Sequence, residues 1–315
     1  MSNITNDKLK IALEHYFVSG GASGLTVETA ERYKRKARQL FPDWMAFMET
    51  TTAIKANYND YEMKLLARGG RIVPTLTKKV DFSGTTVNVG FWTDSHFGSV
   101  YNKRYIWDAF VKETRDCEML VCAGDVTEGM NLSRIDQVYE LSHIGYEAQK
   151  NEAVERLEEV DADKPVYMVD GNHDRWYKRH GAWIVRDIAE TLTARGRPVH
   201  YLGEDEGHLK IKGAEVWLWH GEDGSSYAFS YRIQKIVESL SGGAKPNVLL
   251  CGHTHKAIYL FPRNIHCISG GALTTQSRWM RGKRQENHTG FWKVKLTVDN
   301  RGVNACEMKF FPFYE

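Results

Sequence analysis

VYMVDGNHD, residues 166–174, is the stretch around which the chain is organised. Its apolar, β-branched first half predicts a short buried strand, and Gly171 marks the end of that strand. Asn172, His173 and Asp174 follow at once, so an amide, an imidazole and a carboxylate stand next to one another. Because the chemistry of α/β proteins gathers beyond the carboxyl ends of strands, this stretch predicts an active site.

Four other apolar runs also end in residues that can bind a metal. The run 87–93 precedes Asp94 and His96, 119–123 precedes Asp125, 216–219 precedes His220, and 248–251 precedes His253 and His255. With Asn172, these strand ends supply seven oxygen or nitrogen ligands, which is too many for one tetrahedral ion and about right for two. Two ions in one site are a common device for cleaving phosphate esters.

The ligand types narrow the choice of metal. Mixed imidazole and carboxylate ligands suit Mn, Fe, Zn or Ni rather than Ca, and Mg would require more oxygen. We therefore expect two divalent ions, with Mn²⁺ as the first choice and Fe, Zn, Ni or Mg as alternatives. His173 has no metal to bind in this scheme, so it is the candidate general acid or charge stabiliser.

The bulk composition is that of an ordinary globular protein, with 42% hydrophobic and 26% charged residues in 315. A net charge of +2 is too small to indicate a nucleic-acid or membrane partner by itself. The apolar runs are shorter than the ~18 residues of a membrane helix, and the first residues do not predict a signal peptide. The five cysteines lack CxxC spacing, which predicts reduced thiols and a cytoplasmic protein.

Residues 1–75 differ from the rest and predict a small all-α domain. Helices are expected at 8–18, from the N-cap Thr26 to near Pro42, and at 43–58, with a glycine-rich break at 19–24 and a linker at 69–74. A helix, a short turn and a basic helix suggest helix-turn-helix geometry, in which five cations would face a DNA backbone: Arg32, Lys34, Arg35, Lys36 and Arg38. The alternative is a small appendage with a solvated basic face.

Residues 76–315 predict an α/β domain. Strands are expected at 87–93, 118–123, 166–170 and 198–202, alternating with helices at 103–115, 135–160 and 182–194. This alternation predicts a largely parallel sheet covered on both faces. After residue 205, one helix at 227–240 and strands at 208–212, 215–219, 247–251, 257–261, 265–269, 291–298 and 303–311 predict antiparallel β-structure.

Taken together, the strand-end residues form five motifs in a fixed order: Asp-x-His at 94–96, Gly-Asp at 124–125, Gly-Asn-His-Asp at 171–174, His220, and Gly-His-x-His at 252–255. This set resembles the calcineurin-like metallophosphoesterases. The resemblance implies a four-layer α/β/β/α sandwich with a two-metal centre, and the His220 motif is the shortest of the five. The implied ligands are Asp94, His96, Asp125 and His255 for one ion, and Asp125, Asn172, His220 and His253 for the other.

The same resemblance implies that His173 acts on the leaving group and that Asp174 orients it. The sequence GDVTEG at 124–129 lacks the arginine of the Ser/Thr phosphatase branch. The sequence DSHFG at 94–98 is similar to the Asp-x-His-x-Gly of the DNA-repair nucleases, although the Gly-Asp motif continues differently. The predicted function is therefore a hydrolase that uses a metal-activated water, first as a DNA-directed phosphodiesterase. The alternatives are a small-molecule or nucleotide phosphoesterase and a non-catalytic DNA-binding protein on the same scaffold.

Basic residues near the predicted loops are the candidates for substrate contact. Arg175 and Arg179 follow the catalytic loop, and Arg278 and Arg281 flank Trp279. Cations interleaved with aromatic residues fit a phosphate backbone with stacked bases, whereas the alternative is a set of solvated loops. DNA is thus the expected partner, without a membrane, and self-association or an ATPase partner is suggested by analogy alone.

Overall fold

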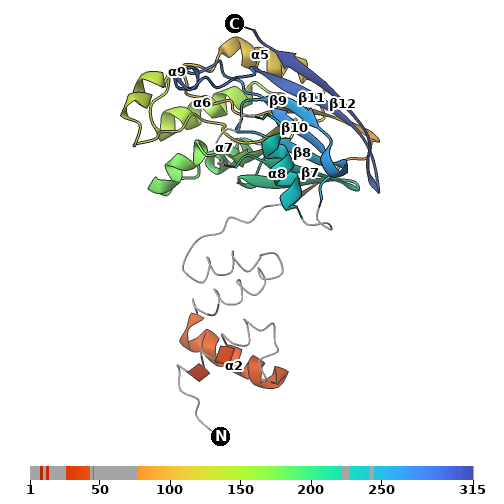
Figure 1. Cartoon of the computed structure of the whole chain (residues 1–315). Helices are drawn as coiled ribbons and strands as arrows, with labels where there is room; N and C mark the ends of the chain where they lie inside the picture. Colours follow the sequence, from red (N-terminus) through yellow and green to blue (C-terminus); the bar gives the residue numbers. More distant parts are fainter. Residues whose placement is uncertain are drawn as a thin grey trace. The chain divides into compact units, whose positions relative to one another are not determined.

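The structure is a computed structural model of the whole chain, and it describes residues 8–9, 12–13, 26–42, 45, 77–221, 228–240 and 245–314 (Figure 1). Contacts divide the chain into two compact units, Met1–Pro74 and Thr75–Glu315. Among the described residues, no helix is both long enough and apolar enough to cross a membrane. All five cysteines are free thiols, as expected.

The smaller unit contains the helix α2, Val27–Leu40. Its predicted start is confirmed, because the Thr26 hydroxyl caps the helix by accepting a hydrogen bond from the Thr29 amide at 3.2 Å. Ala37 is buried on α2 and belongs to a small core with Leu9, Leu13 and Met45. Most of the helices expected at 8–18 and 43–58, and the linker at 69–74, lie outside the described residues.

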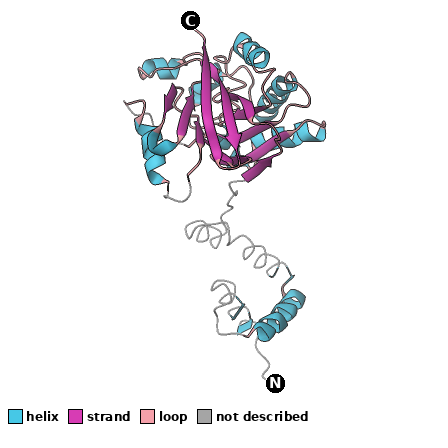
Figure 2. Cartoon of the chain, turned by 90° about the vertical axis from the view of Figure 1, so that its right-hand side faces the viewer, coloured by secondary structure: helices cyan, strands magenta, loops and turns pink. Residues whose placement is uncertain are grey.

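The larger unit is built on two six-stranded sheets with helices on their outer faces (Figure 2). The first sheet has the order β12-β11-β2-β3-β4-β5. Its strands are β2 Thr86–Trp92, β3 Met119–Cys122, β4 Val166–Asp170, β5 Val199–Glu204, β11 Gly290–Asp299 and β12 Gly302–Pro312. The second sheet has the order β1-β6-β7-β8-β10-β9. Its strands are β1 Thr77–Val80, β6 Glu206–Ile211, β7 Ala214–Trp219, β8 Val248–Cys251, β9 Ala257–Leu260 and β10 His266–Gly270.

Period-2 alternation in the strands explains the layers. On β2, Val89 and Phe91 point into the core between the sheets, where Val216 and Leu250 of the second sheet meet them. Trp92 points to the opposite face and packs against the helices that cover the first sheet: α5 Arg104–Glu113, α6 Tyr146–Glu158 and α7 Ile184–Ala194. The helix α8, Tyr231–Ser239, covers the second sheet through Ile233 and Val237. The expected α/β/β/α sandwich is confirmed.

Parallel pairing places the predicted site at one edge. In the first sheet, β2, β3 and β4 run parallel, so the loops that carry Asp94, Asp125 and Asn172 leave from the same edge. In the second sheet, β7 and β8 run parallel, so His220 and His253 also follow neighbouring strand ends. Residues far apart in the sequence are brought together because parallel strands deliver their loops to one side.

Two expectations about the elements were wrong. The single helix at 135–160 is two elements, the 3₁₀ helix η1 at Ile135–Glu140 and the helix α6, because Gly145 adopts a left-handed backbone (φ 93°) at the start of α6. The strands after residue 205 are not all antiparallel, since β8 pairs in parallel with both β7 and β10. The helix α8 is the crossover that makes the first of these parallel pairs, as parallel strands require.

The remaining helices of the described residues are short, and two of them, at 174–180 and 278–282, lie near the predicted loops. They are the 3₁₀ helices η2 Asp174–His180 and η3 Pro262–Asn264, and the helix α9 Arg278–Gly282. The Ser277 hydroxyl caps α9 by accepting a hydrogen bond from the Met280 amide at 3.2 Å. This cap fixes α9 beside the carboxyl ends of the strands, where the predicted site lies.

Candidate metal centre

The backbone of the predicted ligand loops turns sharply at the strand ends. Five of the predicted ligands have positive φ angles between 46° and 76°: Asp94, His96, Asp125, His253 and His255. Neighbouring loops are joined by backbone hydrogen bonds, from the Asp94 amide to the Gly124 carbonyl and from the His96 amide to the Asp125 carbonyl, both at 3.0 Å. The left-handed turns therefore direct side chains from several strands toward one point.

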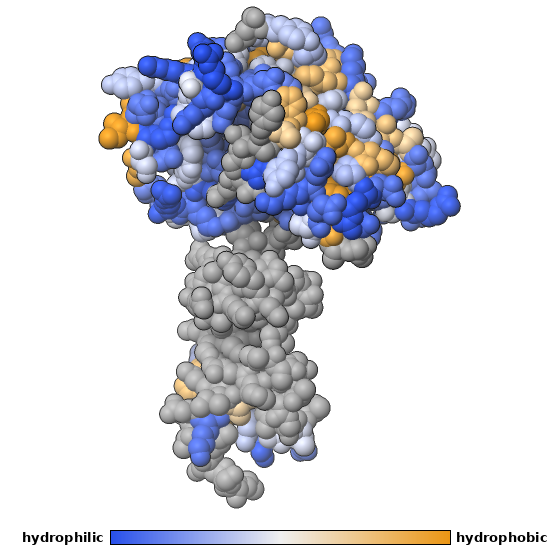
Figure 3. Space-filling view, viewed as in Figure 1, coloured by the Kyte–Doolittle hydropathy of each residue, from blue (hydrophilic) through white to orange (hydrophobic). Residues whose placement is uncertain are grey.

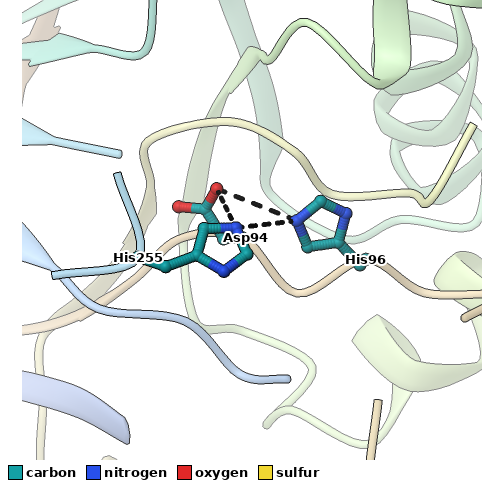
Figure 4. A group of neighbouring side chains, drawn as sticks. All are labelled: Asp94, His96 and His255. Atoms are coloured by element: carbon teal, nitrogen blue, oxygen red, sulfur yellow. Dashed lines mark hydrogen bonds and ion pairs between the residues drawn. The ribbon is translucent and has the colours of Figure 1, made fainter. Parts of the chain in front are cut away.

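Asp94, His96 and His255 form the first ligand group (Figure 4). The Nε2 atoms of the two imidazoles lie 3.2 Å apart, and the Asp94 Oδ1 atom lies 3.2 Å from His255 Nε2 and 3.8 Å from His96 Nε2. The side chain of Asp94 is buried, yet its Oδ1 atom makes no hydrogen bond of good geometry. A buried carboxylate oxygen that faces two ring nitrogens fits a cation, because buried polar atoms otherwise find a hydrogen-bond partner.

Asp125, Asn172, His220 and His253 form the second ligand group. The His220 Nε2 atom lies 3.1 Å from both Asp125 Oδ2 and Asn172 Oδ1, and His253 Nδ1 lies 2.8 Å from the same Asn172 oxygen. The other ring nitrogen of His220 lies 2.6 Å from the Ala123 carbonyl, so it must carry the proton. His220 Nε2 is therefore the nitrogen that a metal can bind, and the N and O atoms of this group suit the same divalent ions as the first.

Asp125 stands between the two groups. Its Oδ2 atom lies 3.1 Å from His220 Nε2 and 3.9 Å from His96 Nε2. Its Oδ1 atom accepts a hydrogen bond from the His173 backbone amide at 2.8 Å. Burial by itself would raise the pKa of the Asp125 carboxyl, but the imidazoles of His220 and His173 lower the pKa well below its usual range. Asp125 is therefore ionised and placed as the expected shared ligand would be.

His173 is held at the edge of this cluster. Its Nδ1 atom lies 2.7 Å from the Glu128 carbonyl oxygen, which fixes a proton on Nδ1. Nε2 is therefore the ring nitrogen that can gain or lose a proton. The ring packs against Trp176, with the two centroids 4.0 Å apart, and meets the ring of His96 edge-on. Burial lowers the pKa of His173.

Asp174 acts differently from the expectation. Its carboxylate accepts hydrogen bonds from the backbone amides of Val126, Thr127 and Gly171, at 2.8 to 3.0 Å, and from the Thr127 hydroxyl at 2.8 Å. Three of these bonds come from backbone amides and one from a hydroxyl, and none comes from the ring of His173. Asp174 therefore fastens the loop after β4 to the loop after β3, and it positions His173 only through the chain that both residues share.

Glu128 was not assigned a role from the sequence. It is buried, its Oε2 atom lies 3.2 Å from His96 Nδ1, and its Oε1 atom accepts a hydrogen bond from Gln137 Nε2 at 3.2 Å. Although burial opposes the charged ring, contact with Glu128 raises the pKa of His96 to about 9. The only sequence feature that could have indicated this role for Glu128 is its position three residues after Asp125.

Asn287 was also not predicted from the sequence. Its side-chain oxygen lies 2.8 Å from His255 Nδ1, and it belongs to none of the five motifs.

Comparison with known proteins agrees with this geometry. Residues 87–281, more than half of the chain, match the calcineurin-like phosphoesterase superfamily domain. The chain belongs to the calcineurin-like phosphoesterase superfamily. Because the members of this superfamily are metal-binding hydrolases, the match agrees with the sequence motifs and with the clustered ligand residues.

One curated relative of this chain is the DNA polymerase II small subunit of Methanothermobacter thermautotrophicus. It is 23% identical over 252 residues, which cover 65% of this chain and 50% of the relative. The chain thus spans about half the length of the curated relative it matches. Similar solved structures include an archaeal phosphodiesterase (13% identity, 72% of this chain and 99% of that one, TM-score 0.40) and the phosphoesterase Yfce of E. coli (19%, 70% and 98%, TM-score 0.39).

A pocket of about 370 Å³ opens beside the candidate metal centre. The metal-ligand residues His96, Asp125 and Asn172 contribute to its lining, as do His173 and Trp176. The wall is completed by residues from three further segments: Tyr101, Arg134 and Glu140, and Ser277, Trp279, Met280 and Gln285. Aromatic rings, a cation and a carboxylate thus surround the place where a phosphate ester would reach the centre.

The four predicted substrate residues differ in position. The expectation that Arg175 contacts the substrate is corrected. Its guanidinium is paired with Asp205 and its side chain is only 10% exposed, so it does not face a substrate. Arg179 is exposed at the end of η2 and is absent from the residues that line the pocket. Arg278 and Arg281 are exposed on α9, the helix that supplies Trp279 and Met280 to the pocket. The prediction for Arg175 failed because its ion-pair partner, Asp205, lies thirty residues away in the sequence and no local pattern indicates the pair.

Proposed function

We propose that the chain is a dinuclear, metal-dependent phosphodiesterase that hydrolyses DNA. The observation that carries this proposal is the arrangement of two ligand groups on either side of Asp125 Oδ2, which lies 3.1 Å from one imidazole and 3.9 Å from another. When bound there, two divalent ions supply a Lewis acid for the phosphate and a water of lowered pKa. The proposed ligands are Asp94, His96, Asp125, Asn172, His220, His253 and His255, and Mn²⁺ is the proposed metal.

His173 has the position of the group that serves the leaving oxygen. The Glu128 carbonyl holds Nδ1 and its proton, so Nε2 is the nitrogen that can exchange a proton with the substrate. Burial lowers the pKa of His173, and an anionic phosphate beside the ring would oppose that effect. The substrate itself thus favours the protonated ring that a departing alkoxide requires.

Three observations support DNA as the substrate. Exposed cations on α9 and in the turn after it lie beside the pocket, and Trp279 of the same helix lines it. The curated relative that matches the chain is a DNA polymerase small subunit. On α2, Arg32 and Arg35 are exposed on one face of the helix together with Gln39, which suits a phosphate backbone. Self-association and an ATPase partner stay predictions from family likeness.

A second candidate function is a small-molecule or nucleotide phosphoesterase. It is favoured by the volume of the pocket, about 370 Å³, which is the size of cavities that enclose small ligands. The third candidate, a DNA-binding protein without catalysis, is disfavoured because both ligand groups are complete. Elemental analysis separates it from the others, since a scaffold of that kind would hold no metal.

The test is a substrate panel on protein reconstituted with Mn²⁺, containing single- and double-stranded DNA, cyclic nucleotides, phosphomonoesters and bis-p-nitrophenyl phosphate. We expect DNA cleavage that stops on chelation and in the variant His173→Ala. The matched control is His180→Ala, an exposed histidine at the end of η2, which should retain activity. Turnover of bis-p-nitrophenyl phosphate without any DNA cleavage would instead establish the small-molecule function.

A further inference from the structure

We propose that the substrate is an unpaired DNA strand, which lies in the cleft between η1 and α9 and stacks its bases on exposed apolar side chains at the two lips. This inference rests on the proposed function and names the form of DNA that the site accepts. It depends on three features of the larger unit: the origin of the two pocket walls, the outward face of η1, and the charge of the segment that starts with α9.

The two walls of the cleft come from different segments. Arg134, which directly precedes η1, and Glu140, its last residue, line the pocket on one side. Trp279 and Met280 of α9 line it on the other side. The predicted metal ligands lie among the lining residues of the same pocket. A substrate bound in this pocket therefore has both η1 and α9 beside it.

The spacing of residues along η1 separates an inner face from an outer face. In a 3₁₀ helix, residues three apart lie on the same face. Arg134, Gln137 and Glu140 have this spacing and point inward: the first and last line the pocket, and Gln137 is buried and donates a hydrogen bond to Glu128. Ile135 and Tyr139 are left outside, with exposed fractions of 88% and 85%.

This outer face is part of a larger apolar surface. Leu132 is 65% exposed and Ile144 is 57% exposed, and both belong to the same stretch of chain as η1. Figure 3 shows exposed apolar residues at the left edge of the larger unit, where Figure 1 draws this stretch in yellow-green. These four side chains do not line the pocket, but they are exposed within one short stretch that also supplies Arg134 and Glu140 to its wall. Large apolar side chains exposed close together indicate a binding surface, because single exposed ones would be scattered.

The opposite lip is basic and aromatic. The eight residues 278–285 include four cations and no carboxylate, and the cations Arg278, Arg281, Lys283 and Arg284 are all exposed. Trp279 stands among them with 47% of its surface exposed. On the η1 side, Arg134 and Glu140 pair at 3.2 Å and the carboxylate of Asp136 is exposed, so that lip is acidic and repels phosphates. Phosphates are thus attracted to the α9 lip, and bases are left to the apolar η1 lip.

These features select an unpaired strand over a duplex and over a protein. Proteins bind single strands by combining cations for the backbone with aromatic or apolar faces on which bases stack. In a duplex the base faces are already stacked on one another, so Trp279 and Tyr139 would have nothing to cover. A protein partner for the η1 surface would not require the four cations of the α9 lip, which form no ion pair with any of the described residues.

The test measures DNA binding by fluorescence anisotropy, with one labelled oligonucleotide used both unpaired and annealed to its complement. The full-length variant His173→Ala is used as the parent, so that the strand is not cut during the measurement. We expect this parent to bind the unpaired strand at least about tenfold more tightly than the duplex. In that background, Tyr139→Ala and Trp279→Ala should each weaken single-strand binding by about tenfold, because stacking on one aromatic residue contributes that much.

Two controls keep the test specific. Trp279→Phe should retain most of the binding, since it preserves a stacking surface. Tyr314→Ala removes a tyrosine that is as exposed as Tyr139, at 89%, but lines a different hollow, so it should bind like the parent. Equal affinity for the two forms of DNA, or single-strand binding that is unchanged in both alanine variants, would overturn the inference. Cleavage of the same oligonucleotides by the wild-type chain tests the proposed function separately. A wild-type chain that binds the unpaired strand but does not cleave it would refute the proposed function, whereas the affinities alone decide whether the cleft prefers an unpaired strand.

Discussion

The Nε2 atoms of His96 and His255, 159 residues apart in the sequence, face each other at 3.2 Å. The Nδ1 atom of His255 already holds its proton toward Asn287, at 2.8 Å, so its Nε2 atom presents a lone pair. In the metal-free centre the protonated ring of His96 can donate a hydrogen bond across this contact, and a metal ion would replace that proton. With the Asp94 carboxylate beside both nitrogens, this relationship is the local reason for a cation at this position, and it leads to the first prediction.

Removing one imidazole from each group should remove metal separately. We expect His255→Ala to lose about one ion per chain and His220→Ala to lose the other, whereas Asp125→Ala should lose both because it serves both groups. Elemental analysis of reconstituted protein measures the stoichiometry. His180→Ala is the matched control. A single histidine variant that loses both ions would show that the groups are not independent.

Metal affinity should rise with pH. In the metal-free centre, burial opposes protonation of His96 and His220, but the carboxylates of Glu128 and Asp125 raise the pKa of each imidazole to about 9. Each ring is therefore protonated at pH 7 and must release its proton to bind an ion. Below pH 9, each released proton contributes about a tenfold gain in affinity per pH unit.

Competition with a chelator at pH 6, 7, 8 and 9 measures this slope. Glu128→Gln should make the slope shallower, because it removes the charge that raises the pKa of His96. A chelator titration in which the apparent affinity does not change between pH 6 and 8 would contradict the assignment of these imidazoles as ligands.

A methyl group at Gly171 should damage the centre. A Cβ atom there would lie far inside van der Waals distance of the Asp125 backbone nitrogen and carboxylate. Gly171→Ala should therefore displace the shared carboxylate and reduce both metal content and hydrolysis of bis-p-nitrophenyl phosphate. Gly282→Ala meets no atom within 4 Å and is the control. Equal metal content in the two variants would show that Gly171 does not approach Asp125 closely.

The loop junction at Asp174 should be important for stability. Asp174→Ala would leave three backbone amides and the Thr127 hydroxyl without their buried acceptor. Because each unpaired buried donor costs free energy, we expect the free energy of unfolding to fall by about 3 kcal/mol or more. Urea denaturation measures the change. Asp108→Ala removes a surface partner of Arg104 and should have little effect.

The basic face of α2 should contribute to DNA affinity if the smaller unit binds DNA. We expect the double variant Arg32→Ala/Arg35→Ala to bind DNA more weakly and to reduce the slope of log affinity against log salt by about two, one for each lost phosphate contact. Lys112→Ala/Arg115→Ala, near the end of α5, is a control of equal charge. An unchanged slope would mean that α2 has a solvated face only.

Much of the fold could be predicted because hydrophobic periodicity reports burial directly. The strands around Val89, Val121 and Tyr167 are mostly apolar and buried, and a polar residue or a glycine marks the boundary within two residues of the end of each. The break between η1 and α6 was missed because Gly145 is the only local signal in a stretch with helical periodicity. Parallel pairing of β8 was missed because pairing partners depend on the path of the whole chain rather than on local pattern.

The site divides in the same way. Residues that follow strands within short motifs, such as Asp94 and His253, could be found because chain geometry restricts where they lie. Asn287 could not be found, since it reaches His255 from a loop that no periodic pattern fixes. Arg175 was misjudged because its ion pair with Asp205 depends on how two distant loops fold together. Sequence patterns do not predict which side chains of irregular segments contact one another, and this is why these parts of the site could not be predicted.

The left-handed turns at Asp94, His96, Asp125, His253 and His255 have a consequence for how this protein can change. A side chain in that conformation costs about 1 kcal/mol or more relative to glycine, so the five together weaken the fold by an amount comparable to the whole stability of many domains. Glycine at any of these positions would relax the backbone and abolish a ligand in the same mutation. At these five positions, a substitution that increases the stability of the fold therefore removes a metal ligand. If metal binding were no longer needed, we expect these five residues to be replaced first.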